Sequence, residues 1–357
     1  MKRVKRDSGK FEALELYTTL GQEHQYKLYA EEDVKAFMQS IGDSLKAAQN
    51  NDSLIHGKRI ETLFKHLAVG LDGCQLVKTE DAGETFTSGE SEVLPPDYKL
   101  ILNDGRQIFV EVKNCNQPNP RSPYYFTKKY IDKVEKYGEM HGIPVYYAIY
   151  YRCLNQWTMI PKSAMRELER KYETGLIHSI ANNEMSMLGD MMIGTKPDLT
   201  FELIVDKAKE VKTTDDNKTH FTIGDVKIYC DDVEVDNSEE KNIAFYLMRF
   251  GKWACSEPVG IMDNEDNLHS VQFTFSPETL ELAEKQGFEF IGDLSSMITS
   301  AFNERTIYEQ RVTSLDARME DVFKVKIRKE YKGENLPLWL MSMQPNPDYH
   351  EGTAVVV

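Results

Sequence analysis

The chain has 357 residues, of which 41% are hydrophobic and 28% charged, and its net charge is −15; these values are typical of a soluble globular protein with two or three domains. No stretch approaches the roughly 18 apolar residues of a membrane span, and no apolar run follows the basic N-terminus as in a signal peptide, so no membrane association is expected. Five scattered cysteines without a Cys-x-x-Cys pair argue against zinc and disulfides and predict a cytoplasmic location.

The first segment of the chain, residues 11–50, has the pattern of helices. One of them begins near Glu31 and places four apolar residues on one face, namely Val34, Phe37, Met38 and Ile41. We expect residues 1–53 to form a helical appendage that packs on the domain that follows, and a DNA-recognition element is the alternative.

A second helix is predicted after the break at residues 50–53, which offers an N-cap. Its apolar residues recur with helical spacing, and Glu61 borders their stripe, which consists of Ile60, Leu63, Phe64, Leu67 and Leu71. A short strand at residues 75–77 and a polar loop over residues 79–93 are expected next.

Two β-rich runs, residues 97–102 and 106–113, flank Asn103-Asp104-Gly105 and predict a hairpin. A two-residue loop would place Asp97 opposite Val112. A three-residue loop with Gly105 in a left-handed conformation would place Asp97 opposite Glu111. We predict the second register, a choice led partly by the chemistry of the two carboxylates.

The second strand of this hairpin has two different faces, because side chains alternate along a strand. Ile108, Val110 and Val112 form one face, expected to pack on a core, and Phe109, Glu111 and Lys113 form the other, which carries the charge. Two facing carboxylates repel each other unless a cation lies between them, and a hard divalent cation fits oxygen ligands. An ordinary exposed, ion-paired hairpin is the alternative.

The region after the hairpin holds candidate nucleic-acid contacts. The proline-rich segment 114–123 contains Asn114 and Arg121, which can contact a scissile strand, while an exposed connector explains the segment equally well. A helix is predicted over residues 125–140, with Tyr130, Val134 and Tyr137 on one side. Its Lys129, Lys133 and Lys136 are candidate phosphate contacts, although a solvated face is the favoured interpretation. Strands are predicted at residues 145–151 and 155–160.

The second half of the chain carries the whole acidic excess. Residues 1–175 hold 25 Lys and Arg against 25 Asp and Glu, whereas residues 176–357 hold 18 against 33. Acidic surfaces repel phosphate backbones, so a protein partner or an oligomer contact suits this half better than DNA. We expect an α+β domain of unknown role at residues 176–345 and a tail at 346–357, with strands at 199–205, 221–229 and 270–275 and helices at 277–286, 293–303 and 305–330.

The sequence Pro95-Pro96-Asp97, followed after thirteen residues by Glu111-Val112-Lys113, resembles the signature of the PD-(D/E)XK nuclease superfamily, which includes restriction endonucleases and archaeal Holliday-junction resolvases. The resemblance implies an α/β fold with a restriction-endonuclease-like mixed central sheet flanked by helices over residues 54–175, beside the additional α+β C-terminal domain. The doubled proline departs from the pattern, in which a single proline is usual, and Glu61 matches the acidic residue on the preceding helix.

The resemblance further implies an Mg²⁺-dependent endonuclease that hydrolyses phosphodiester bonds of DNA, with Mn²⁺ as a substitute and RNA as an open alternative. Asp97, Glu111 and Glu61 would bind metal, and Lys113 would orient the attacking water. Restriction-like antiviral defence in a prokaryote follows from the habit of the family, and a homodimer or a protein partner would use the acidic half. The rival interpretations are a catalytically inactive nuclease-fold subunit and a regulatory protein-interaction protein.

Overall fold

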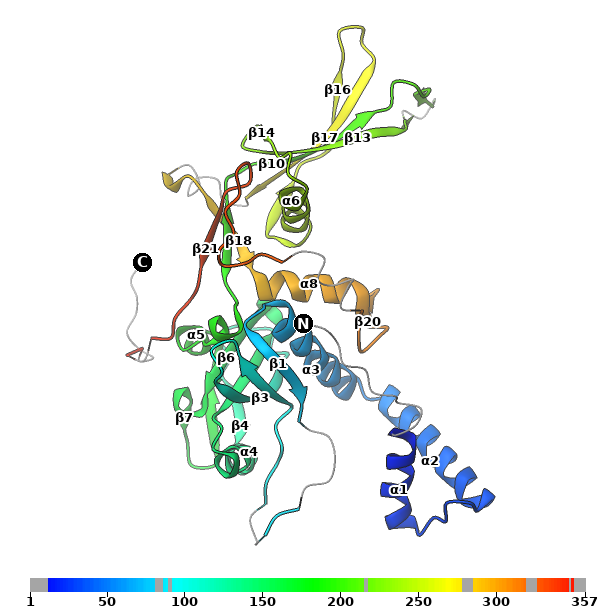
Figure 1. Ribbon diagram of the computed structural model, residues 1–357, viewed down its shortest axis with the longest axis vertical. Coiled ribbons are helices and arrows are strands. Elements are labelled where there is room, and N and C mark those ends of the chain that lie inside the picture. The colour runs from blue at the N-terminus through cyan, green and yellow to red at the C-terminus, as the bar shows by residue number, and fades with distance from the viewer. Residues whose placement is uncertain are drawn as a thin grey trace.

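The structure is a computed structural model that describes residues 12–80, 86–88, 92–214, 218–277, 285–318, 326–346 and 348–349. A five-stranded sheet lies toward one end of the long axis and a six-stranded sheet toward the other (Figure 1). In this part of the chain, no helix is long and apolar enough to cross a membrane. The architecture is mixed α/β, which confirms the predicted class at this level.

The N-terminal helices α1 (Glu12–His24) and α2 (Glu31–Gln49) form a hairpin that projects from the rest of the molecule (Figure 1). The ring of Tyr17 meets that of Phe37 edge-on at 5.0 Å, so the two helices pack on each other. Phe37 is buried, but Val34 and Met38 are exposed, contrary to the prediction that this face packs on the body. The helical spacing of the apolar residues predicted the helix correctly, but the prediction that this whole face is buried was wrong.

The five-stranded sheet has the order β1-β2-β3-β5-β6. Strands β3 and β5 are parallel, and the other neighbours are antiparallel, so the sheet is mixed. The hairpin predicted from Asn103-Asp104-Gly105 is the β2–β3 unit. The strands are β1 (Cys74–Thr79), β2 (Tyr98–Leu102), β3 (Gln107–Cys115), β5 (Val145–Tyr151) and β6 (Gln156–Pro161).

Helix α3 (Asp52–Gly70) covers one face of this sheet. The side chain of Asn51 caps it by accepting a hydrogen bond from the Leu54 N–H at 3.1 Å. Its predicted stripe is buried and shares one core with the apolar face of β3; this core includes Ile60, Leu63, Phe64, Leu67, Ile108, Val110 and Val112. Burial of so many aliphatic side chains is the main force that fixes α3 against the sheet.

Helix α4 (Lys128–His141) covers the opposite face. Phe109 of β3 is fully buried there, in a second core with Ile131 and Val134. This is also the face that carries Glu111 and Lys113, as predicted. The charged groups of β3 therefore lie beneath a helix rather than on an open surface.

The helix expected over residues 125–140 begins later than predicted, because Tyr124–Thr127 is strand β4. The sequence Tyr-Tyr-Phe-Thr favours strand, and Phe126 is buried against Tyr147. The helix ends at Gly142, whose φ of 65° is left-handed. Strand β4 forms a small sheet with β8 (Lys171–Thr174) and β7 (Arg166–Glu167). The short helices of this region are η1 (Arg152–Leu154), η2 (Lys162–Ala164), α5 (Leu176–Ala181) and η3 (Met185–Leu188).

The second half contains the strands predicted near 199–205, 221–229 and 270–275 and builds two further sheets from them and their neighbours. The three-stranded sheet consists of β18 (Glu289–Asp293), β9 (Met192–Thr195) and β21 (Leu338–Met341). The six-stranded sheet consists of β10 (Leu199–Val205), β13 (Ile223–Cys230), β14 (Val233–Glu234), β15 (Trp253–Cys255), β16 (Val259–Met262) and β17 (Leu268–Pro277), and β11 (Lys212–Thr213) pairs with β12 (Thr219–His220).

Helix α8 (Leu294–Thr306) joins the two halves, since it contacts both α3 and α6 (Ser238–Phe250) (Figure 1). The indole N–H of Trp157 donates to the Thr299 hydroxyl of α8 at 3.0 Å. One continuous hydrophobic core extends from Ile60 of α3 to Leu336. The position of α8 therefore depends on residues from both ends of the chain.

The helix expected over residues 305–330 is wrong over its first part. Ile307–Tyr308 (β19) and Arg311–Val312 (β20) form a hairpin, and the two residues between them, Glu309 and Gln310, have φ values of 47° and 65°. Most of the helix expected at 277–286 lies outside the described residues, as does most of the predicted tail. Within that tail, the Asn346 N–H donates to the Ala181 carbonyl of α5 at 2.7 Å.

Candidate functional site

The β2–β3 hairpin has the three-residue loop that was predicted. Tyr98 pairs with Val110 and Leu100 with Ile108, a register that places Asp97 across from Glu111. The Leu102 N–H donates to the Arg106 carbonyl at 2.9 Å, and Gly105 between them has a φ of 86°. Only glycine adopts this conformation without strain, so Gly105 decides which residue faces Glu111.

Asp97 lies just before β2 and is tied to β3. Its Oδ2 accepts a hydrogen bond from the Val112 N–H at 2.7 Å. Burial and then the charge of Glu111 raise the pKa of Asp97 to about 7, against the opposing effect of the Val112 hydrogen bond. A carboxylate held in this way is short of positive charge, and a cation beside it would stabilise its ionised form.

Glu111 and Lys113 are joined through Tyr130. Lys113 Nζ lies 2.6 Å from Glu111 Oε1 and donates to the Tyr130 hydroxyl at 2.7 Å, and the Tyr130 hydroxyl donates to the same Glu111 oxygen. Glu111 is only 3% exposed. The three groups form a closed triangle in which one carboxylate oxygen receives two hydrogen bonds.

The hydrogen bond of Tyr130 to Glu111 was not predicted from the sequence, which placed Tyr130 only on the packing side of its helix. Tyr130 is in the first turn of α4, the helix that crosses the charged face of β3. A tyrosine in the first turn of the helix after a Glu-x-Lys strand is the signal that would have drawn attention to it.

Glu61 comes near the cluster from α3. The Tyr98 hydroxyl donates to the Glu61 carbonyl at 2.9 Å, and the charge of Glu61 contributes to the raised pKa of Asp97. The Glu61 carboxylate itself pairs with Lys58, 2.7 Å away and one turn earlier. The structure thus brings Glu61 to the edge of the cluster, with its side chain paired elsewhere.

The donor set of the cluster fits a hard divalent cation, because Asp97 and Glu111 offer carboxylate oxygens from facing positions. Burial, and then the charge of Glu111, disfavour the ionised form of Asp97, and a cation at the same place would favour it. Among the described residues, however, no three His, Cys, Asp or Glu side chains are arranged to hold a metal ion together. A third carboxylate ligand would require Glu61 to turn away from Lys58.

The predicted nucleic-acid contacts have varied surroundings. Asn114 directly follows Lys113, and its Oδ1 is buried without a hydrogen-bond partner in the described structure. Arg121 is exposed in the following loop. Lys129 and Lys133 both pair with Glu92, and Lys136 pairs with Glu139 at 3.0 Å. These three lysines are already engaged in ion pairs on the solvent side of α4, which agrees with the favoured interpretation of a solvated face.

The chain matches no family model and no curated protein sequence. Among solved structures, it is similar to Hjc, a Holliday junction resolvase from the archaeal hyperthermophile Archaeoglobus fulgidus, with 14% sequence identity and a TM-score of 0.23. The match covers 33% of this chain and 84% of that one. At this TM-score the likeness is too weak to support an argument about function, which must come from the geometry.

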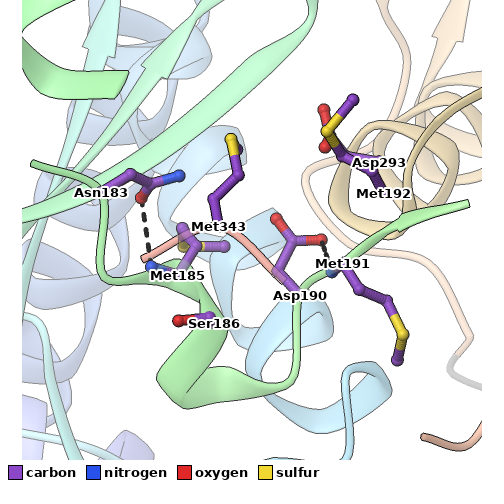
Figure 2. Close-up of a pocket in the computed structure, with 8 residues that line it drawn as sticks. All are labelled: Asn183, Met185, Ser186, Asp190, Met191, Met192, Asp293 and Met343. Carbon is purple, nitrogen blue, oxygen red and sulfur yellow. Dashed lines mark hydrogen bonds between the residues drawn. The ribbon is translucent and has the colours of Figure 1, made fainter. Parts of the chain in front are cut away.

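A second acidic pair, Asp190 and Asp293, borders a pocket lined by residues from the second half of the chain (Figure 2). Asp190 accepts hydrogen bonds from the Ser295 N–H at 2.9 Å and the Ser295 hydroxyl at 2.6 Å. Burial and the charge of Asp293 raise the pKa of Asp190 to about 7. The pocket has a volume of about 10 Å³, room for one water molecule. It is too small for a nucleotide, and Asp190 serves there to anchor α8.

Tyr130→Phe is expected to lower any cleavage rate about tenfold, beyond any loss of stability that it shares with the control variant Tyr137→Phe. The change removes a hydrogen bond to a charged group, and such bonds contribute about 1.5–3 kcal/mol. Cleavage kinetics and thermal unfolding should be measured together. Tyr137→Phe is the matched control, because it removes from the same helix a phenol that donates to Glu80, outside the cluster. An equal effect of the two substitutions on the cleavage rate would contradict a role of Tyr130 in the carboxylate cluster.

Asp97→Asn is expected to raise the stability of the metal-free protein at pH 8 by about 1–2 kcal/mol. The pKa of Asp97 is about 7 in the folded state, against an ordinary value of 3.8, so the folded state binds the proton more tightly. Stability therefore falls as the pH rises from about 4 to 7, and asparagine avoids that loss. Thermal unfolding in EDTA at pH 8 and pH 4 tests this.

In this test the gain should disappear at pH 4, where Asp97 is largely protonated in the folded protein. Asp104→Asn is the control, since Asp104 is a carboxylate in the exposed turn of the same hairpin. A gain that is the same at both pH values would show that ionisation of Asp97 is not its cause.

Proposed function

We propose that the chain is a metal-dependent nuclease of the PD-(D/E)XK type, with its nuclease core at residues 54–175. The observation that carries the proposal is the register of the β2–β3 hairpin. It sets Asp97 opposite Glu111 and holds Lys113 on the same face, 2.6 Å from the Glu111 carboxylate. Two carboxylates can hold a divalent cation, and a lysine beside them can orient a water or a phosphate oxygen, which suits metal-dependent hydrolysis of a phosphodiester.

In this proposal Asp97 and Glu111 would hold Mg²⁺, with Mn²⁺ as a substitute, and Glu61 would join them after leaving Lys58. The cation, when bound, supplies Lewis-acid chemistry that lowers the pKa of water and offsets negative charge on phosphate. Lys113 donates hydrogen bonds and would orient a water or a phosphate oxygen. Tyr130 limits the movement of the Lys113 amine, because it accepts one of its hydrogen bonds.

DNA is the proposed substrate, and RNA is the alternative that a cleavage assay distinguishes. A restriction-like defence role and an assembly through the acidic residues 176–345 rest on the resemblance of the sequence alone. The acidic half also packs one of its own helices, α8, against α3 of the proposed nuclease core, which gives this half a structural role independent of any partner.

A nuclease-fold subunit without cleavage is the second candidate, and one observation favours it. Lys113 already neutralises Glu111, and Lys58 already neutralises Glu61, so side chains of the protein itself compensate these two carboxylates. This candidate predicts that the protein binds nucleic acid and leaves it intact in the presence of Mg²⁺ or Mn²⁺.

Incubation of the full chain with supercoiled plasmid, single-stranded DNA and RNA, each in Mg²⁺, Mn²⁺ or EDTA, tests the proposal. Nicking or linearisation that requires the metal supports the nuclease. Cleavage that persists in EDTA contradicts the assigned chemistry. Binding without cleavage of any of these substrates would favour the inactive subunit.

A further inference from the structure

A group of three basic side chains lies at the start of α3, outside the carboxylate cluster. His56 and Arg59 are three residues apart in α3 and share one face of it. Arg152 begins η1, the turn between β5 and β6. The charge of Arg152 acts on both His56 and Arg59, so the three side chains belong to one local environment.

Helix α8 forms the common floor of this group. The Arg59 Nε donates to the Thr306 hydroxyl at 3.1 Å, and its Nη2 donates to the Asn303 side chain. At the end of the η1 turn, Asn155 donates to the Ser296 carbonyl at 3.0 Å. These contacts fix Arg59 and the turn that carries Arg152 against the same helix.

Arg59 is a buried cation without a counter-charge in the described structure. It is 3% exposed, and its hydrogen bonds go to neutral oxygens. Among the described residues, no carboxylate forms an ion pair with Arg59 or Arg152. A buried charge is costly unless an opposite charge approaches it, so this arrangement is one that an anion would stabilise.

The positive charges of this group disfavour the charged forms of its two helical members, His56 and Arg59. Burial and the charges of Arg152 and Arg59 lower the pKa of His56, while Asp52 in the first turn of α3 opposes this effect. Burial lowers the pKa of Arg59 to about 10, which leaves the guanidinium charged at neutral pH. Exposure increases from Arg59 through His56 to Arg152, so the positive potential opens to the surface at Arg152.

We propose that His56, Arg59 and Arg152 form a phosphate-binding site for the backbone of a nucleic acid. Arg152 and His56 would contact the phosphate, and Arg59 would supply the buried positive charge behind them. The choice of a nucleic acid rests on the proposed nuclease function. Glu61 of the carboxylate cluster is carried by the same helix, five residues after His56.

Binding of labelled DNA to the full chain in EDTA, followed by fluorescence anisotropy over a series of salt concentrations, tests the site without any cleavage. Arg152→Ala is the main variant, because Arg152 is exposed and its loss should leave the fold intact. It is expected to weaken binding about tenfold at low salt. The slope of log K against log salt should fall by about 0.9, the value for one lost phosphate contact. Lys209→Ala removes an exposed charge outside this region and should change neither quantity.

The outcomes of this experiment distinguish the phosphate-binding site from the proposed nuclease function. Unchanged affinity and slope for Arg152→Ala would overturn the site. Arg152-dependent binding by a protein that cleaves nothing in Mg²⁺ would leave the site and contradict the nuclease. The wild-type protein could instead fail to bind DNA while inorganic phosphate raises its melting temperature but not that of Arg152→Ala. This result would contradict the nucleic acid as the ligand and show a site for a free anion.

Discussion

Lys113→Ala protein is expected to lose metal-dependent cleavage by at least about a hundredfold. Lys113 is the one amine among the described residues that bonds to Glu111, and it is placed to act on a water or a phosphate oxygen near the two carboxylates. Removal of a single donor that stabilises developing charge typically costs about 10²–10³ in rate. The rate of plasmid nicking in Mg²⁺, compared with wild type at equal protein concentration, measures the effect.

A control for Lys113→Ala exists in the same sheet. Lys78 of β1 pairs with Glu80, two residues further along the chain, at 2.8 Å, as Lys113 pairs with Glu111 two residues before it. Lys78→Ala therefore removes a similar ion pair from outside the cluster and should leave the cleavage rate unchanged. If both variants lose activity equally, the loss reflects the sheet rather than the proposed site.

Gly189→Ala is expected to destabilise the protein by more than about 3 kcal/mol, a large fraction of the roughly 5–15 kcal/mol by which folded proteins are typically stable. Gly189 has a φ of 96°, and a Cβ there would lie 2.1 Å from the Leu71 carbonyl oxygen. That oxygen belongs to the backbone at the end of α3, so it cannot move without displacing the helix. Urea unfolding, or the yield of folded protein, measures the loss.

Gly105→Ala separates the strain of the left-handed backbone from the close approach to Leu71, the two causes of the expected loss at Gly189. Gly105 has a similar φ of 86°, but no atom lies within 4 Å of the position of a Cβ. Its substitution should cost only the strain of the left-handed conformation, about 1 kcal/mol. Equal costs at the two glycines would show that the close approach to Leu71 does not matter.

The parts of the site that could be predicted are those determined by local rules. Strand alternation and the Asn103-Asp104-Gly105 turn left two registers open, and the chemistry of the two carboxylates favoured the one with Asp97 opposite Glu111, which the structure confirms. Helical spacing was enough to identify the buried stripe of α3. In both cases the information lies within a few residues of the group concerned.

Features that depend on distant partners were missed. Tyr124–Thr127 is a strand because it pairs with β8, more than forty residues later. The contact of Tyr130 with Glu111 requires α4 to cross β3 in one particular orientation. Val34 and Met38 have helical spacing but no partner surface in the described structure, so periodicity alone gave the wrong burial. Long-range packing, which a single sequence does not specify, decided all three.

Calorimetric titration of Mn²⁺ into wild-type, Asp97→Asn and Glu111→Gln protein at pH 8 tests whether Asp97 and Glu111 form a metal site, because it detects metal binding without requiring the correct substrate. We expect the wild-type protein to bind Mn²⁺ and each substitution to weaken the binding at least about tenfold, since each removes one carboxylate ligand. Wild-type protein that binds no Mn²⁺, or variants that bind it as tightly as wild type, would contradict the claim that Asp97 and Glu111 form a metal site.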